Sequence, residues 1–224
     1  MERNVFSDFK NELKRSLRLY AVTDRSWTGE RTLLEQIESV LVGGVTAVQL
    51  REKFLSKSEL VQEARAVKEL CARFDVPLFI NDFVDVANLV DADGAHVGQS
   101  DSETSEARAS LGNARVLGVS VQTVEQALLA ESRGADYLGV GAVFSTQTKA
   151  DAEKVETSTL RAICDAVKIP VVAIGGITLE NMELLADVGV SGVAVVSAIF
   201  AQSDVELATW RLRERADELF GADS

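Results

Sequence analysis

Short apolar runs, rich in β-branched residues, alternate along the chain with longer stretches in which apolar residues recur every three or four positions. The short runs predict strands, and the longer stretches predict amphipathic helices. We expect eight strands, over residues 18–24, 47–52, 77–82, 94–99, 115–121, 136–144, 170–177 and 192–200. The helical stretches between them include 32–44, 56–74, 123–135, 157–169 and 178–190. The chain therefore repeats a strand–helix unit.

The strands indicate a parallel sheet. The runs VVAI at 171–174 and VAVV at 193–196 are apolar on both faces, as in a sheet that helices cover. Eight such units in 224 residues predict an α/β fold, a closed (β/α)8 TIM barrel, which typically takes about 250 residues. Pro77 and Pro170 stand at strand starts, where a missing N–H costs little. An open doubly wound sheet is the alternative, but no G-x-G-x-x-G follows the first strand.

A further segment precedes the first strand. Its apolar residues follow a helical spacing, which predicts an extra N-terminal helix packed on the barrel. These residues are Val5, Phe6, Phe9, Leu13 and Leu17. We therefore expect two parts, the helix at 1–17 and a single barrel domain at 18–224.

Composition narrows the classes of partner. With 46% hydrophobic and 26% charged residues, the chain is typical of a globular protein rather than a disordered one. A formal net charge of −12 repels polyanions, so we expect no nucleic acid and no membrane surface as a partner. No apolar run is long enough to span a bilayer, and Cys71 and Cys164 form no metal or disulfide pattern, so we expect a reducing cytoplasm. A homo-oligomer is as compatible with the sequence as a monomer.

Polar residues at the carboxyl ends of the strands are the candidate site residues, because TIM barrels carry their chemistry there. Gln49, Arg51 and Lys53 alternate along the end of the second strand and would share one face. The alternative is a solvated strand end in which Glu52 pairs with Lys53.

Two aspartates follow neighbouring strands. Asn81 and Asp82 end the third strand, and Asp101 comes soon after the fourth. Carboxylates at adjacent strand ends can hold one Mg²⁺, which takes few protein ligands and keeps several waters. Each aspartate alone is more often a helix N-cap, so the metal prediction depends on the pair.

His96 is the only histidine, and it lies inside a predicted strand rather than at its end. This position favours a hydrogen-bonded core histidine over a catalytic base. Nothing around it supports a Ser/His/Asp triad, and the further histidines typical of a zinc site are missing from the sequence.

A polar connection of about eleven residues follows the sixth strand and contains Thr146, Thr148 and Lys149. Hydroxyl donors and a cation suit phosphate oxygens, whereas the alternative is a mobile linker.

The last two strands end at residues suited to a phosphate. Gly176 follows the seventh strand, and Val196 and Ser197 end the eighth, where barrels often bind phosphate through backbone N–H groups. For the Gly175–Gly176 pair, a tight turn is the alternative.

Taken in order, these segments resemble the thiamine-phosphate synthase family, also called thiamin phosphate pyrophosphorylase. The resemblance covers nearly the whole chain, and seven motifs in order are far more specific than any one of them. They are QLREK at 49–53, ND at 81–82, HxGQxD at 96–101, GVS at 118–120, TxTK at 146–149, AIGGI at 173–177 and VVSAI at 195–199.

The resemblance implies a Mg²⁺-dependent transferase acting on small phosphorylated molecules. Such an enzyme joins a hydroxymethylpyrimidine diphosphate to a hydroxyethylthiazole phosphate and releases diphosphate. The residues implied for the pyrimidine diphosphate are Gln49, Arg51, Lys53, Asn81, Ser120 and Lys149. Those implied for the thiazole phosphate are Thr146, Thr148, Gly176, Val196 and Ser197. Asp82 and Asp101 would hold Mg²⁺, and no residue would act as a nucleophile.

The sequence departs from the family pattern at one turn, where Ala142 follows Gly141 in place of the usual proline, a change expected to loosen that turn. Two rival functions remain at this point. A thiazole tautomerase of the same barrel type would explain AIGGI and His96, but not the cationic strand end or the paired aspartates. A barrel that only binds a thiazole or thiamine phosphate is the other.

Overall fold

The computed structural model describes residues 12–98, 104–146 and 154–221, in which eight parallel strands close into a barrel. The strands are β1 (Leu19–Val22), β2 (Ala47–Leu50), β3 (Leu78–Asn81), β4 (Gly94–Val97), β5 (Val116–Val121), β6 (Tyr137–Val140), β7 (Val171–Ile174) and β8 (Gly192–Val195). Each strand pairs with the next, and β8 pairs with β1. The predicted (β/α)8 TIM barrel is confirmed.

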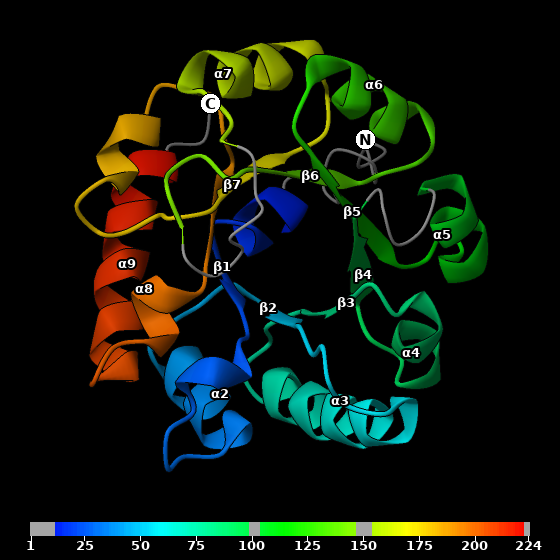
Figure 1. The fold of residues 1–224 in the computed structure, drawn as a ribbon, viewed down its shortest axis with the longest axis vertical. Helices are drawn as coiled ribbons and strands as arrows, with labels where there is room; N and C mark the ends of the chain where they lie inside the picture. The colour runs from blue at the N-terminus through cyan, green and yellow to red at the C-terminus, as the bar shows by residue number, and fades with distance from the viewer. Residues whose placement is uncertain (1–11, 99–103, 147–153, 222–224) are drawn as a thin grey trace, which may run out of the picture.

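Helices surround the strands as an outer ring (Figure 1). They are α2 (Leu33–Val42), α3 (Lys57–Ala72), α4 (Val84–Leu89), α5 (Thr104–Leu111), α6 (Val124–Ser132), α7 (Thr157–Ala166), α8 (Ser197–Phe200) and α9 (Val205–Phe220), with 3-10 helices η1 (Arg25–Trp27) and η2 (Met182–Leu185). Capping boxes, in which N-cap and N3 side chains satisfy each other's N–H groups, start α2, α3 and α6. Within the described residues, no helix is long and apolar enough to cross a membrane.

The buried apolar side chains form two clusters. The larger one lies where the helices pack on the strands, and the smaller one fills the barrel. Inside the barrel, the rings of Tyr20, Phe79 and Tyr137 meet edge to face, with centroids 5.5 to 6.1 Å apart. Tyr20 and Tyr137 also line the floor of the cavity described below.

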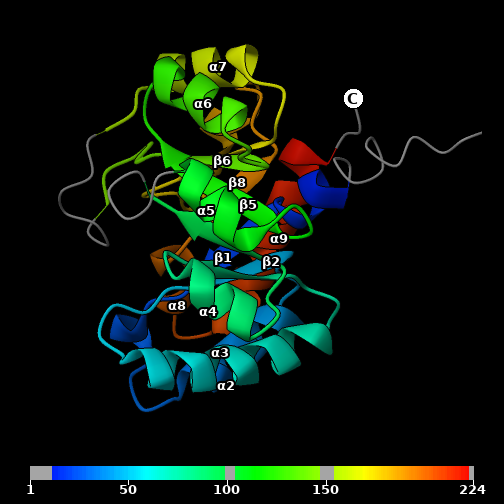
Figure 2. The same ribbon diagram turned by 90° about the vertical axis from the view of Figure 1, so that its right-hand side faces the viewer.

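The N-terminal segment packs on one end of the barrel. Residues 12–16 are helical, and the buried Leu13 and Leu17 join the interior cluster. The segment lies on the side of the barrel away from α8 (Figure 2), and Arg18, which follows it, pairs with Asp217 of α9 at 3.1 Å. The predicted extra helix is confirmed for this part, and the division of the chain at residue 17 stays a prediction. Outside the described residues lie Val5, Phe6 and Phe9.

Several predicted elements were wrong in part, and the strand expected over 136–144 ends at Val140. Residues 192–200 were expected to form one strand, but β8 ends at Val195 and α8 begins at Ser197, because a short buried apolar run is ambiguous between strand and helix. The helix expected over 178–190 is only the 3-10 helix η2. The side chain of Asn181 accepts from the N–H of Thr178 and donates to the carbonyl of Gly176, a local turn that competes with a helix start.

Candidate active site

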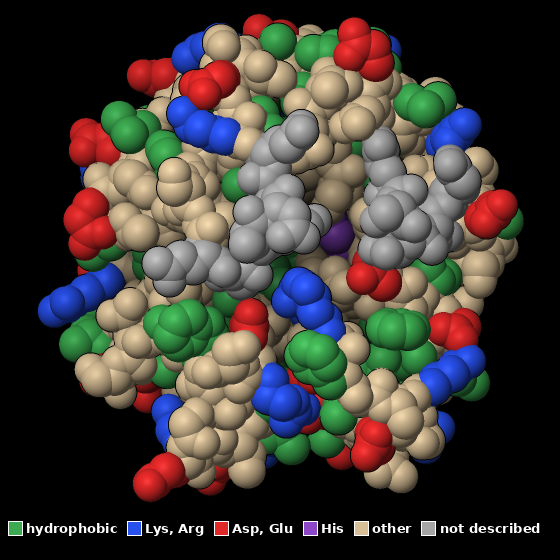
Figure 3. Space-filling model, viewed as in Figure 1, with side chains coloured by type: hydrophobic (Ala, Val, Ile, Leu, Met, Phe, Trp, Pro, Cys, Tyr) green, Lys and Arg blue, Asp and Glu red, His purple; other side chains and the backbone are tan. Residues whose placement is uncertain are grey.

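A cavity of about 810 Å³ opens at the carboxyl ends of the strands, within the usual size of a ligand pocket. Figure 3 views this end of the molecule, where the surface is hollowed near its centre and a Lys or Arg side chain lies at the edge of the hollow. Ten of the thirteen predicted site residues line the cavity: Gln49, Arg51, Lys53, Asn81, Asp82, Ser120, Thr146, Gly176, Val196 and Ser197. Outside the described residues lie Asp101, Thr148 and Lys149.

The end of β2 presents three side chains to this cavity, as their alternation predicts. Gln49 is buried, Arg51 is half-buried and Lys53 is exposed, so the row leads from the floor to the mouth. Thr23 holds the backbone of this row, because its N–H donates to the carbonyl of Gln49 at 3.0 Å and its Oγ1 accepts from the N–H of Arg51 at 2.9 Å. Asp24 Oδ2 lies 4.0 Å from Arg51 Nη1.

Glu52 points away from the row. Its buried carboxylate accepts from Nε and Nη2 of Arg25 at 3.2 and 3.0 Å, and Arg25 also bonds Glu63. Burial raises the pKa of Glu52, an effect that Arg25 opposes. The alternative of a Glu52–Lys53 pair is therefore wrong, because Arg25 is the partner of Glu52 and fastens η1 to the end of β2.

The side chains of Asn81 and Asp82 place oxygen atoms that could bind a metal at the end of β3. Asp82 has a left-handed backbone, with φ of 64°, which aspartate tolerates better than most residues. Its N–H donates to the carbonyl of His96 at 2.8 Å, and its Oδ2 accepts from Asn81 Nδ2 at 2.6 Å. This half-buried carboxylate fits Mg²⁺, which needs few protein oxygens. Within the described residues, no group of three or more His, Cys, Asp or Glu side chains could hold a metal.

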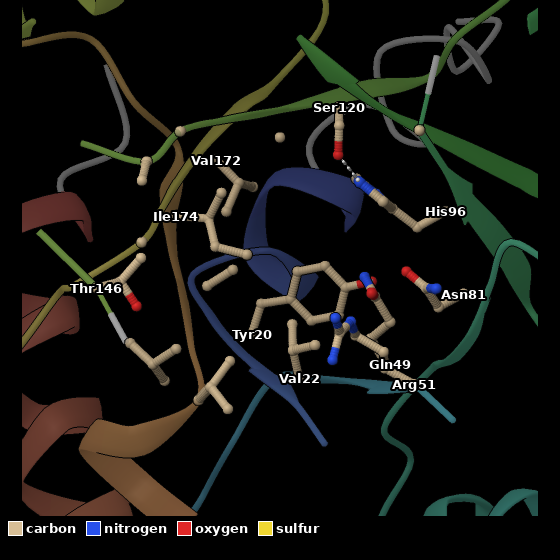
Figure 4. Close-up of a pocket in the computed structure, with 18 of the residues that line it drawn as sticks. Tyr20, Val22, Gln49, Arg51, Asn81, His96, Ser120, Thr146, Val172 and Ile174 are labelled. Atoms are coloured by element: carbon tan, nitrogen blue, oxygen red, sulfur yellow. Dashed lines mark hydrogen bonds between the residues drawn. The ribbon is translucent and has the colours of Figure 1, made fainter. Parts of the chain in front are cut away.

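A chain of hydrogen bonds crosses the floor of the cavity. Gln49 Nε2 donates to the hydroxyl of Tyr20 at 2.8 Å, and this hydroxyl lies 3.0 Å from that of Tyr137. The Tyr137 hydroxyl lies 2.9 Å from His96 Nδ1, and His96 Nε2 lies 2.9 Å from Ser120 Oγ. Figure 4 shows the last contact, with Gln49, Arg51 and Asn81 on one side of Tyr20 and Thr146 on the other. The five hydrogen-bonded residues, which we call the floor chain, are Gln49, Tyr20, Tyr137, His96 and Ser120.

Burial decides the charge state of the floor chain. It lowers the pKa of His96 to about 4, so the imidazole is neutral at pH 7. It also raises the pKa values of both phenols above their ordinary range. The prediction of a hydrogen-bonded core histidine is confirmed.

Sequence reasoning missed the two tyrosines of the floor chain. For Tyr137 the available signal was the glycines that make room for it and for its partner His96: a Cβ on Gly118 would lie 2.1 Å from Tyr137 Cζ, and one on Gly139 would lie 3.0 Å from His96 Cε1. Both glycines sit in interior strands, where glycine otherwise weakens a sheet.

The ends of β7 and β8 form the opposite wall of the cavity. Gly176 has φ of +63°, and a Cβ there would lie 2.3 Å from the carbonyl oxygen of Ser145. The predicted tight turn and the cavity-lining position are thus both observed at this glycine. Val196 and Ser197 line the cavity at the start of α8, and Thr146 lines it from the β6–α7 loop.

The turn that lacks the family proline is held by backbone hydrogen bonds. The N–H groups of Val143 and Phe144 donate to the carbonyls of Ile174 and Gly175, each at 3.0 Å, and the carbonyl of Ala142 accepts from Val155 at 2.8 Å. That Ala142 loosens this turn stays a prediction.

Comparisons with known proteins identify the family of this chain. The model of the family described as thiamine monophosphate synthase matches residues 19–199, from β1 into α8. The chain belongs to this family. Among curated family members, thiamine-phosphate synthase of Ruminiclostridium cellulolyticum is 48% identical over 196 residues, which are 88% of this chain and 93% of that protein. The enzyme of Clostridium botulinum is 44% identical over 210 residues, 94% of this chain and 98% of that protein.

A solved structure of a thiamine phosphate pyrophosphorylase from Pyrococcus furiosus has a TM-score of 0.87 and 40% identity, over 93% of this chain and 100% of that one. A 3-hexulose-6-phosphate synthase, 19% identical with a TM-score of 0.67, shares the fold alone. Membership of the thiamine monophosphate synthase family confirms the prediction of an enzyme, a transferase of thiamine biosynthesis.

Proposed function

We propose that the protein is a Mg²⁺-dependent thiamine-phosphate synthase. It joins 4-amino-2-methyl-5-hydroxymethylpyrimidine diphosphate to 4-methyl-5-hydroxyethylthiazole phosphate and releases thiamine monophosphate and diphosphate. The observation that carries this proposal is the cavity itself, where a cationic strand end, an oxygen-ligand pair and a glycine turn face one space. Two anionic substrates need such separate anion sites in one cavity.

The pyrimidine diphosphate is assigned to the β2–β5 side of the cavity. Gln49, Asn81 and Ser120 offer hydrogen-bonding groups for the ring, and Arg51 and Lys53 offer charge for the diphosphate. Lys149, from the loop after β6, is assigned to the same diphosphate.

Asp82 and Asp101 are assigned to Mg²⁺. When bound, the ion would neutralise charge on the diphosphate as it leaves. The left-handed backbone of Asp82 and its bond from Asn81 orient the one carboxylate of this pair that the described residues include.

The thiazole phosphate is assigned to the opposite wall. Gly176, Val196 and Ser197 line it, and backbone N–H groups in such a position can bind phosphate oxygens. Thr146 and Thr148 complete this side. The thiazole ring would then lie across the cavity from the pyrimidine, as bond formation between them requires.

The reaction proposed is a dissociative substitution. Diphosphate leaves an electron-rich pyrimidinylmethyl carbon through a carbocation-like state, and the thiazole nitrogen then forms the new C–N bond. The protein supplies positioning and charge neutralisation rather than a nucleophile. His96 suits no base role in this scheme, because both of its nitrogens face hydroxyls of the floor chain.

The same chemistry suggests the partners and the compartment of the protein. The partners we propose are the two small phosphorylated substrates and no nucleic acid, with a homo-oligomer left open. The free thiols of Cys71 and Cys164 suit a reducing cytoplasm.

The test is to incubate the protein with both substrates, with and without Mg²⁺, and to measure thiamine monophosphate and diphosphate. We expect both products in equal amounts only when Mg²⁺ is present. No product with both substrates and Mg²⁺ overturns the proposal. Isomerisation of a thiazole phosphate carboxylate without Mg²⁺ would show the tautomerase instead.

A further inference from the structure

The floor chain joins two residues that face the proposed pyrimidine site. Gln49 and Ser120 stand at its ends and line the cavity from β2 and β5. Between them, Tyr20, Tyr137 and His96 are at most 8% exposed, so they bond mainly to one another. The two ends are therefore connected through side chains that solvent barely reaches.

The protons of this chain can be followed from one end to the other. Gln49 Nε2 donates to the hydroxyl of Tyr20. Either phenol could be the donor in the next contact, and in the order proposed below Tyr20 donates to Tyr137. The hydroxyl of Tyr137 in turn donates to His96 Nδ1. A neutral imidazole carries one proton, so it is on Nε2, which donates to Ser120 Oγ.

In this order, each end of the floor chain keeps one hydrogen-bonding group for a ligand. Gln49 uses its amide nitrogen on Tyr20, so its Oε1 is the atom left to accept from a ligand. Ser120 accepts from His96, so its own hydroxyl proton is left to donate to a ligand. If the Gln49 amide turned over, every bond in the chain would reverse, and so would both ends. One end is an acceptor whenever the other is a donor.

The barrel is built around this chain. Gly118 lies opposite both His96 and Tyr137 in the sheet register, and Gly139 lies opposite Ser120. A Cβ on Gly118 would overlap the Tyr137 ring, as the 2.1 Å separation shows. A phenylalanine would fill the interior as well as Tyr137 does, so packing alone does not require its hydroxyl.

We propose that Tyr20, Tyr137 and His96 are positioning residues that fix Gln49 as an acceptor and Ser120 as a donor. The cavity then selects a heteroaromatic ring that presents an amine toward β2 and a hydrogen-bond acceptor toward β5. It rejects the oxo counterpart, in which the amine donor is replaced by a carbonyl acceptor. This inference rests on the proposed function, because it takes an aminopyrimidine diphosphate as the substrate.

The first test reads the direction of the floor chain without a substrate. His96 is the only histidine, so ¹⁵N-histidine labelling of the chain without a polyhistidine tag gives imidazole signals that need no assignment. We expect Nε2 protonated and Nδ1 unprotonated at pH 7. The opposite tautomer, or a charged ring, overturns the inference.

The second test measures selectivity by calorimetry with Mg²⁺ present. The ligands are the aminopyrimidine diphosphate, its oxo analogue and the thiazole phosphate. Tyr137→Phe cuts the chain at its centre, and we expect it to reduce the preference for the amino ring about tenfold, the worth of one hydrogen bond. Affinity for the thiazole phosphate should stay within twofold. Tyr20→Phe, which cuts the chain beside Gln49, should act in the same way if Tyr137→Phe fails to fold.

Phe79→Leu is the matched control. Phe79 packs on both tyrosine rings but carries no polar atom, so this variant disturbs the same packing and leaves the floor chain intact. We expect its preference for the amino ring to match that of the wild type. A loss equal to that of the tyrosine variants would show a packing effect and overturn the inference.

The outcomes separate this inference from the proposed function. Wild-type protein that forms thiamine monophosphate, while both tyrosine variants keep the full preference for the amino ring, overturns the positioning role alone. Wild-type protein that binds neither pyrimidine and forms no product overturns the proposed function and the ligand assigned here.

Discussion

The side chain of Arg51 is held in place by the residues around it. Its backbone is bonded to Thr23, and its guanidinium is half-buried near Asp24, whereas Lys53 two positions further is exposed. An exposed cation contributes little to binding because water and salt screen it, but a partly buried one contributes more. Of the two cations at the end of β2, Arg51 is therefore the one on which the proposed diphosphate site depends more.

We expect Arg51→Ala to lower kcat/KM for the pyrimidine diphosphate by about 100-fold, the worth of a charge-assisted hydrogen bond or two. KM for the thiazole phosphate should change little. Steady-state kinetics with each substrate varied in turn measure both values. Arg73→Ala is the control, since Arg73 is an exposed arginine whose partner is Glu38, remote from the cavity. Equal losses in the two variants would contradict the assignment.

His96 gives a prediction in pH. Its pKa is about 4 in the folded protein against 6.5 in an unfolded chain, so unfolding takes up a proton between these values. Stability present above pH 6.5 is therefore lost as pH falls toward 4, by about 3 kcal/mol from this group. Urea unfolding at several pH values measures the loss. His96→Gln should remove this share of the acid sensitivity, and an unchanged pH slope would show that the native imidazole is charged.

At the scale of elements, the sequence predicts the strands better than their ends. Alternation and apolar runs identify every strand, because burial on both faces demands them. The ends depend on contacts between distant residues, such as the bonds of residues 143 and 144 to the end of β7, and these are invisible in a local pattern. The prediction of a helix around η2 fails for a related reason. The side chain of Asn181 bonds the N–H of Thr178 in a local turn where the helix was expected to begin.

The turn after β7 gives a prediction at this scale. Gly176→Ala should lower the free energy of unfolding by about 2 kcal/mol or more and raise KM for the thiazole phosphate, because the new Cβ meets Ser145. Gly112→Ala is a matched control, since Gly112 also has positive φ, +74°, but no atom within 4 Å of the added Cβ. We expect it to cost about 1 kcal/mol with kinetics unchanged. Denaturation and kinetics of the two variants test the difference, and equal effects would contradict it.

At the scale of the whole molecule, the two ends of the barrel have separate roles. The candidate residues gather at the carboxyl ends of the strands, and the N-terminal helical segment packs its leucines at the other end. Most candidates could be predicted from sequence because strand ends bring them to one edge. Tyr20 and Tyr137 were missed because a buried tyrosine has the same pattern as any core residue, and an interior glycine such as Gly118 is a weak signal for a large ring beside it. The net charge of −12 disfavours polyanions at long range, whereas Arg51 and Lys53 bring positive charge to one side of the cavity.

This separation predicts a stability effect without a kinetic one. Leu17 is fully buried in the interior cluster, so Leu17→Ala should lower the free energy of unfolding by about 3 kcal/mol and leave both KM values unchanged. Leu89→Ala, at an exposed leucine of α4, should change the free energy by less than about 0.5 kcal/mol. Chemical denaturation and kinetics measure both. A raised KM in Leu17→Ala would show that the two ends are coupled.

The floor chain also bears on how this barrel could change over time. One layer of side chains is at once the top of the hydrophobic interior and the bottom of the substrate cavity. A substitution that removed one of its tyrosine hydroxyls would keep the apolar packing but leave the hydrogen-bond partners of that hydroxyl buried and unpaired, which lowers stability. The same substitution would let the enzyme accept a damaged, deaminated precursor. Selection for stability and selection for fidelity therefore act on the same two tyrosine hydroxyls in the same direction.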